Sequence, residues 1–172
     1  MNTQDIRDIY EYNYWANNRL LAMAEKVTPE QFVAPSSHSF SSLQGTLLHN
    51  LDAEWHWRLL LQKGEVWVQP DLEAADFPTV GALQQRWQEE EQSMWGYLNS
   101  LHDEDLSGIV RYLVDGSIVR ERLLWHCLFH IVNHGMQHRS EAANLLTIYS
   151  QSPGQIDFTY FLNERSTQQK QQ

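Results

Sequence analysis

Four long segments of the sequence repeat their apolar residues at the spacing of an α-helix, and this feature restricts the fold most strongly. The prolines fall between or after these segments, so none of them interrupts the helical pattern. Amphipathic helices of such length bury their apolar stripes against one another, and we therefore expect an all-α four-helix bundle. The segments run from about Asp5 to Lys26, from Ser42 to Gln62, from Val80 to Leu101 and from Glu121 to Tyr149.

Two patterns of Ser or Thr followed three residues later by Gln predict where helices begin. Thr28 and Gln31 have the spacing of a capping box, with Pro29 at the first helical position, so a short extra helix should begin there. Ser41 and Gln44 have the same spacing and should begin the second long helix.

The remaining stretches predict small elements around the bundle. "RYLVDGSIVR" at 111–120 predicts a small β-hairpin that turns at Asp115–Gly116, before the last long helix. "DFTYFLNE" near the end predicts another short helix. We expect a single domain over residues 1–165 and a flexible polar tail over residues 166–172.

Composition excludes several classes of protein. The formal net charge is -10, and no run of Lys or Arg offers a surface for phosphates, so we do not expect nucleic-acid binding. No apolar run approaches the roughly 20 residues that span a bilayer, and the N-terminus lacks the pattern of a signal peptide. The single cysteine, Cys127, permits no intrachain disulfide. We therefore expect a cytoplasmic protein without a membrane partner.

Four of the eight histidines stand four residues apart in the last long segment. Each helical residue turns by about 100°, so the row drifts slowly around the helix. With Ile131 at the centre of the apolar stripe, His138 lies about 20° away, His134 about 60°, His130 about 100° and His126 about 140°. The spacing predicts that His134 and His138 face the interior and that His126 faces solvent or a partner.

An inward pair of histidines at i and i+4 can chelate one divalent ion, because both rings project from the same helix face. No Glu follows the first histidine, so a metalloprotease mechanism is not supported. A third ligand is needed, and His49 is a better candidate than His56 because it flanks the apolar stripe of the second long helix. Spacing alone leaves structural histidines as an equal alternative.

Several segments together resemble the DinB-like (damage-inducible) superfamily of metal-dependent proteins. The similar stretches cover nearly the whole chain and keep the family's order: "YNYWANNRLL" at 12–21, "LLHNLDAEWHW" at 47–57, "HIVNHGMQHRSE" at 130–141 and "IDFTYFL" at 156–162. The resemblance implies a four-helix bundle of up-down-down-up connectivity and a divalent metal ion held by His49, His134 and His138. The family commonly has Gly and Gln after its His-Arg pair, where this chain has Ser140 and Glu141.

Related branches of the family include thiol-dependent isomerases and S-transferases. We therefore expect a metal-dependent enzyme that transfers a small thiol to an electrophilic substrate, with zinc, nickel or iron and a low-molecular-weight thiol as cofactors. A metal-dependent hydrolase and a non-catalytic metal-binding stress-response protein are the alternatives. A third hypothesis is a structural homodimer, which Trp125, about 120° from the core centre, would favour if it were exposed. The expected partners are a small-molecule substrate and a second copy of the chain.

No catalytic residue is assigned from the sequence. Asp52 shares the flank of His49 and could orient its ring, although a solvated helix carboxylate is the preferred interpretation. Tyr10 and Tyr14 could reach a cleft, but such tyrosines usually pack. Arg139 could form an ion pair or a dimer contact. Cys127 is expected to be a buried, inert thiol.

One carboxylate, Glu90 or Glu91, interrupts the apolar stripe of the third long segment. We expect it to lie on a solvated edge of the helix; the alternative is an acid that faces an internal cavity.

Overall fold

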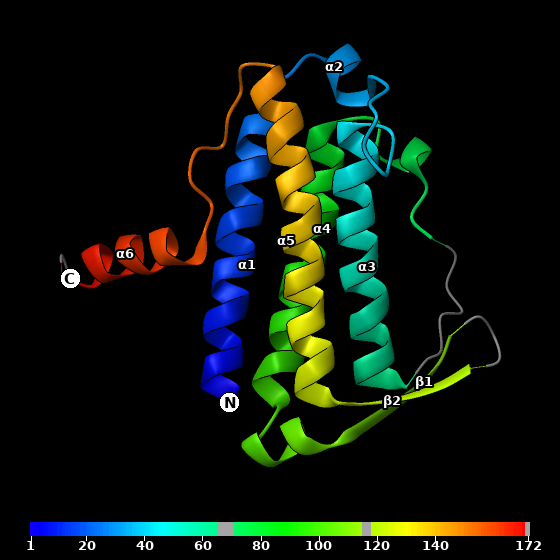
Figure 1. The fold of residues 1–172 in the computed structure, drawn as a ribbon, viewed down its shortest axis with the longest axis vertical. Helices are drawn as coiled ribbons and strands as arrows, with labels where there is room; N and C mark the ends of the chain where they lie inside the picture. Colours follow the sequence, from blue (N-terminus) through cyan, green and yellow to red (C-terminus); the bar gives the residue numbers. More distant parts are fainter. Residues whose placement is uncertain (65–70, 115–117, 171–172) are drawn as a thin grey trace.

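Four long helices stand side by side and form the body of the molecule (Figure 1). The structure is a computed structural model that describes residues 1–64, 71–114 and 118–170. Its helices are α1 (Thr3–Ala24), α2 (Pro29–Val33), α3 (Leu43–Lys63), α4 (Val80–Ser100), α5 (Leu124–Ile148) and α6 (Phe158–Gln169), with 3₁₀ turns at Ala74–Asp76 and Asp103–Ser107 and strands β1 (Ile109–Val114) and β2 (Ile118–Leu123).

The direction of the long helices follows the expected connectivity. α1 runs away from the end where the chain begins, α3 and α4 both run back, and α5 runs in the direction of α1 (Figure 1). α3 packs against α5 and α4, and α1 packs against α5 and α4. The predicted four-helix bundle with up-down-down-up connectivity, short extra helices and a hairpin before the last long helix is confirmed.

The caps show why the helices begin where they do. Thr28 and Gln31 form the predicted capping box, and α2 begins at Pro29. At the start of α3, however, the cap is Ser42, whose hydroxyl accepts from the Gly45 amide at 2.9 Å. The predicted capping box at Ser41 is wrong, because Ser41 lies in the left-handed region with φ of 62° and turns the chain before the helix.

The hairpin explains why α5 begins later than predicted. β1 and β2 pair antiparallel, with Ile109 opposite Leu123 and Val114 opposite Ile118. Residues 121–123 therefore belong to β2, although the helical pattern was expected to begin at Glu121. The predicted turn at Asp115–Gly116 lies outside the described residues. α6 continues to Gln169, into the segment 166–172 for which we expected a flexible tail.

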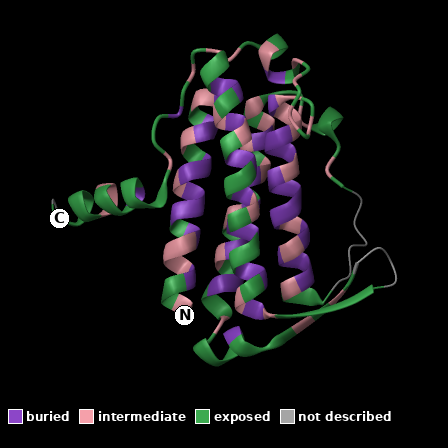
Figure 2. Cartoon of the chain, viewed as in Figure 1, coloured by how far each residue is buried: buried purple, intermediate pink, exposed green. Residues whose placement is uncertain are grey.

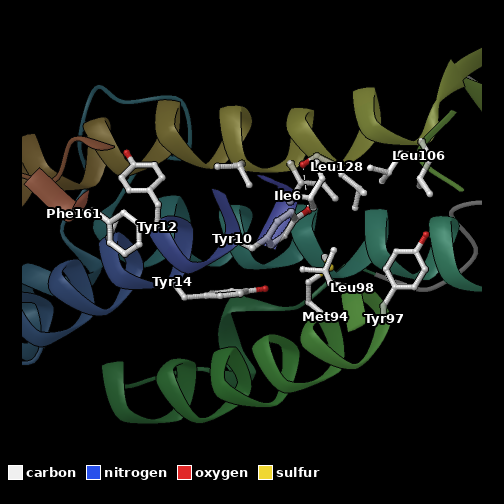
Figure 3. Close-up of a cluster of buried hydrophobic side chains, with 14 residues drawn as sticks. Ile6, Tyr10, Tyr12, Tyr14, Met94, Tyr97, Leu98, Leu106, Leu128 and Phe161 are labelled. Atoms are coloured by element: carbon white, nitrogen blue, oxygen red, sulfur yellow. Dashed lines mark hydrogen bonds between the residues drawn. The ribbon is translucent and has the colours of Figure 1, made fainter. Parts of the chain in front are cut away.

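The core fills the bundle in two clusters, one near each end. Figure 3 shows the first cluster, where Tyr10 of α1 lies near Met94 and Leu98 of α4 and Leu128 of α5. Leucines of α1, α3 and α5 dominate the second cluster at the other end. Each long helix carries both buried and exposed residues, as expected for helices that turn one face toward the core (Figure 2). Each of the described helices is too short or too polar to span a bilayer.

Charged groups also lie inside the bundle. Glu90 is fully buried and forms a two-point ion pair with the Arg58 guanidinium, in which Arg58 Nη2 donates to Glu90 Oε2 at 2.9 Å. The expected solvated edge is therefore wrong for Glu90. A buried carboxylate requires a partner, and α3 supplies it from the facing helix.

Candidate metal centre

Three imidazoles converge where α3 meets α5. His49 comes from α3, and His134 and His138 come from successive turns of α5. The Nε2 atoms of His49 and His134 lie 3.3 Å apart, and those of His138 and His134 lie 3.2 Å apart. One ring nitrogen of each residue lies within 4.8 Å of the others, so this histidine triad could hold a metal ion.

The angular position of each histidine around α5 decides which of the four histidines of this helix join the triad. His138 is buried, His134 is half-buried, and His130 and His126 are exposed. This order is the one that the 100° turn per residue predicts. Gly135 and Ile131, between these histidines, lie in the buried stripe of α5. The predicted inward orientation of His134 and His138 is confirmed.

Hydrogen bonding among the rings alone cannot satisfy the triad. The His134 Nε2 atom has two imidazole nitrogens within 3.3 Å, yet a neutral ring nitrogen either donates one hydrogen or accepts through one lone pair. A tetrahedral cation with metal–nitrogen bonds of about 2.0–2.1 Å would place two ligand nitrogens about 3.3–3.4 Å apart. The observed separations of 3.2 and 3.3 Å therefore fit a shared cation.

Glu141 orients one of the three rings. Its Oε2 atom lies 2.9 Å from His138 Nδ1, one helical turn along α5. Donation from Nδ1–H to a carboxylate fixes the tautomer that leaves Nε2 with a lone pair, which is the usual arrangement around histidine ligands. No role for Glu141 was inferred from the sequence, although its i, i+3 spacing from His138 was a usable signal.

The segment before α3 covers the triad. Phe40 stacks on the His49 ring with centroids 3.7 Å apart and meets His138 edge-on at 5.2 Å. Ser39 Oγ donates to Glu141 Oε1 at 3.3 Å, which attaches the same segment to α5. Phe40 therefore packs on one face of the His49 ring and restricts its movement. The sequence reasoning missed this residue because nothing in its local pattern marks it.

Electrostatics favour neutral rings in the triad. Burial, together with the neighbouring His138 and His49, lowers the pKa of His134 to about 4. Burial and His138 also lower the pKa of His49 below its ordinary value. Neutral imidazole is the form that binds metal ions, so both rings are in the ligating form at neutral pH.

At Gly135, between the two histidines of α5, the helix backbone lies close to polar groups of the core. A Cβ atom at Gly135 would lie 2.9 Å from Arg139 Nη1 and 3.0 Å from Asn50 Oδ1, so glycine permits this approach. Arg139 is buried and donates from Nη1 to Asn13 Oδ1 at 2.5 Å and to Asn17 Oδ1 at 3.0 Å. Arg139 is thus an internal hydrogen-bond donor, and neither the predicted ion pair nor the predicted dimer contact describes its surroundings.

The two candidate tyrosines pack in the core, as expected. Tyr10 donates to the Leu128 carbonyl at 3.2 Å, and Tyr14 donates to Glu54 Oε1 at 2.5 Å. Glu54 also accepts from Asn13 Nδ2 at 3.3 Å. Burial raises the pKa of Glu54 to about 7, despite the opposing hydrogen bond from Tyr14.

His56 and Asp52 lie elsewhere on α3. Asp52 is buried and accepts from the Leu72 amide at 2.9 Å, so the preferred interpretation as a solvated carboxylate is wrong. Its other oxygen lies 3.3 Å from His56 Nδ1, which makes His56 rather than His49 its imidazole neighbour. Asp71 joins them in a second group of potential ligand atoms. His56 is not part of the triad, as predicted.

The last candidate, Cys127, is buried against the bundle. Burial raises the pKa of its thiol to about 11, so it remains protonated at neutral pH. A buried, protonated thiol is a poor nucleophile, in agreement with the inert role expected from the sequence.

The fold and the triad define a class: a helical bundle with three histidines that could bind a metal ion between two of its helices. A comparison with known protein families matches residues 1–171 to the DinB family. The chain therefore belongs to the DinB family, over its whole described length. Among curated proteins, none gives a significant match to this sequence.

Proposed function

We propose that this DinB-family protein is an enzyme that transfers a small thiol to an electrophilic substrate at a divalent metal ion held by His49, His134 and His138. The convergence of the three Nε2 atoms, at separations that suit a tetrahedral ion, carries this proposal. Three neutral ligands would leave the full double charge of zinc, nickel or iron available, and an ion held there would lower the pKa of a coordinated thiol, so that its proton is lost to solvent.

The surroundings of the triad favour thiol transfer over hydrolysis. A hydrolase generally needs a positioned base to accept a proton from water. Among the described residues, Glu141 is the carboxylate in hydrogen-bond contact with the triad, and its oxygens are engaged by His138 and Ser39. A thiol that loses its proton on coordination does not need such a base. Metal-dependent hydrolysis remains the second candidate.

The decisive experiment is metal quantitation on protein purified without an affinity tag. One equivalent of zinc, nickel or iron is expected. The loaded protein should then accelerate the reaction of cysteine or glutathione with an electrophile such as 1-chloro-2,4-dinitrobenzene. Binding of metal without any thiol transfer would support the non-catalytic alternative, and a protein that binds no divalent metal would contradict the proposal.

We also propose a homodimer, which rests on different residues. Trp125 is only partly exposed and packs against the core, so it gives less support than its helical position predicted. Helix α6 extends away from the bundle (Figure 1) and exposes the apolar side chains of Phe158, Tyr160 and Leu162. Exposed apolar side chains that lie together are typical of protein–protein interfaces. Light scattering should give twice the chain mass, and a monomer at all concentrations would contradict this proposal.

A further inference from the structure

The seam between α3 and α5 contains a cavity beyond the triad, toward the β-hairpin. Its volume is about 400 Å³, which lies within the range of small-molecule pockets. Side chains from the second half of α3, the first half of α5 and both strands line it: Trp57, Tyr112, Arg122, His126, Cys127 and His130. Neither the triad nor the proposed metal chemistry accounts for these residues.

Aromatic rings form one part of the lining. Trp57 meets Tyr112 with ring centroids 5.3 Å apart and an angle of 74° between planes. It meets His130 at 5.1 Å and 63°. Three rings from three elements thus stand edge-to-face around one position. Such a cluster offers flat apolar surface and ring edges to a planar ligand.

The charge of the lining is positive, although the protein is strongly acidic. Arg122 donates to the Glu121 carbonyl at 2.8 Å, and among the described residues no carboxylate lies within ion-pair distance of it. The strand register pairs Tyr112 with Arg120 and Val110 with Arg122, so both arginines lie on the hairpin face that carries Tyr112. None of the lining residues is acidic.

The neighbours of Arg122 leave its charge available. Burial raises the pKa of Cys127 to about 11, so this thiol is neutral and supplies no anion. The exposed Arg111–Glu121 pair lies on the opposite face of the hairpin, with a distance of 2.6 Å between Nε and Oε1. Arg122 is therefore suited to bind an anionic group from outside the protein.

The cavity is adjacent to the triad. His130 lines the cavity, and its ring centroid lies 5.8 Å from that of His134. These residues are one helical turn apart on α5. A ligand held by Trp57 and Arg122 would therefore extend along the seam toward the imidazoles.

We propose that this cavity binds a small aromatic carboxylate, with Arg122 on the carboxylate and Trp57, Tyr112 and His130 around the ring. The role of this molecule as the substrate of the metal centre rests on the proposed function. The binding itself rests only on the cavity, its ring cluster and the Arg122 guanidinium, which has no carboxylate partner among the described residues. Aromatic and cationic groups from four elements surround one opening, so the cavity can recognise an aromatic ring and a negative charge in the same ligand.

Calorimetric titration of the metal-loaded protein with benzoate, benzamide and cyclohexanecarboxylate tests the proposal. Benzoate should bind most tightly, because benzamide lacks the charge and cyclohexanecarboxylate lacks the flat ring. Arg122→Gln should weaken benzoate binding roughly ten-fold and leave benzamide binding unchanged. Arg111→Gln, on the opposite face of the same hairpin, is the matched control and should have no effect. Equal binding of benzoate and benzamide, or no loss in Arg122→Gln, would overturn the proposal.

The same titration with His134→Ala separates this proposal from the proposed function. Benzoate should bind this variant as it binds the parent protein, because Arg122 and not the metal holds the carboxylate. If benzoate binding disappears together with the metal, the carboxylate is a metal ligand and the cavity assignment is wrong. Failure of the metal assignment is measured by metal content alone, independently of benzoate.

Discussion

Two sets of polar groups lie inside this bundle, and they differ in kind. The core set is complementary: Glu90 pairs with Arg58, and Glu54 accepts hydrogen bonds from Tyr14 and Asn13. The histidine triad brings together three groups of the same type, whose Nε2 atoms face one another. Complementary groups stabilise each other without a ligand, whereas like groups require a partner from outside. The comparison separates residues that stabilise the fold from residues that could bind a metal ion.

Substitutions in the histidine triad should have the largest effect, which is the loss of metal binding. His134→Ala and His138→Ala should each abolish stoichiometric metal binding, because two imidazoles do not complete a site. His126→Ala, from the exposed end of the same row, should retain the metal. Elemental analysis of the three variants provides the measurement, and equal metal content in all of them would contradict the ligand assignment.

Substitutions in the core set should instead reduce the free energy of unfolding. Glu90→Ala leaves the buried Arg58 guanidinium without its carboxylate, which should reduce the free energy of unfolding by about 3–5 kcal/mol. Glu121→Ala removes the exposed partner of Arg111 and should cost less than about 1 kcal/mol. Urea denaturation measures both. A cost at Glu90 no greater than that at Glu121 would show that the buried pair is dispensable.

Glu54 should make the free energy of unfolding depend on pH. Burial raises its pKa from 4.5 to about 7, so the folded state binds the proton more tightly than the unfolded chain. The associated stability, on the order of 3 kcal/mol, is present below pH 4.5 and is lost as pH rises through 7. In Glu54→Gln, the free energy of unfolding, measured by urea denaturation, should no longer decline between pH 4.5 and about 7. Glu89→Gln, on an exposed face of α4, should preserve it.

The smallest effect is expected from Glu141, whose carboxylate orients His138 and should thereby strengthen metal binding. Glu141→Gln should keep His138 in place but weaken its orientation, so that metal affinity falls about 10–100-fold, or about 1.4–2.7 kcal/mol. Ser140→Ala changes an exposed neighbour and should leave the affinity unchanged. Competition with a metal chelator measures the difference. Unchanged affinity in Glu141→Gln would mean that the carboxylate does not act on the metal centre.

Helical periodicity accounts for most of the agreement between sequence and structure. The apolar stripes gave the four long helices, and the rotation of the histidine row placed His134 and His138 inward. Both features depend on residues within one helix, where geometry is regular. The choice of His49 over His56 also followed from its position beside an apolar stripe.

The errors concern partners on other elements. Glu90 interrupts its stripe in a way that resembles a solvated edge, and only Arg58 of α3 explains its burial. Asp52 is buried because the Leu72 amide reaches it. Phe40 contacts His49 through a loop whose path the sequence does not specify. Contacts between elements depend on how the helices are arranged, which a pattern within one helix does not contain.

Gly135 connects the two sets in one turn of α5. Its lack of a side chain lets the Arg139 guanidinium and the Asn50 amide approach the backbone directly between His134 and His138. Arg139, one turn further along α5, donates to Asn13 and Asn17 of α1, so the part of α5 that carries the two imidazoles is attached to the core. An ion bound there would stabilise the folded state, so the temperature of thermal unfolding should rise with the concentration of free metal.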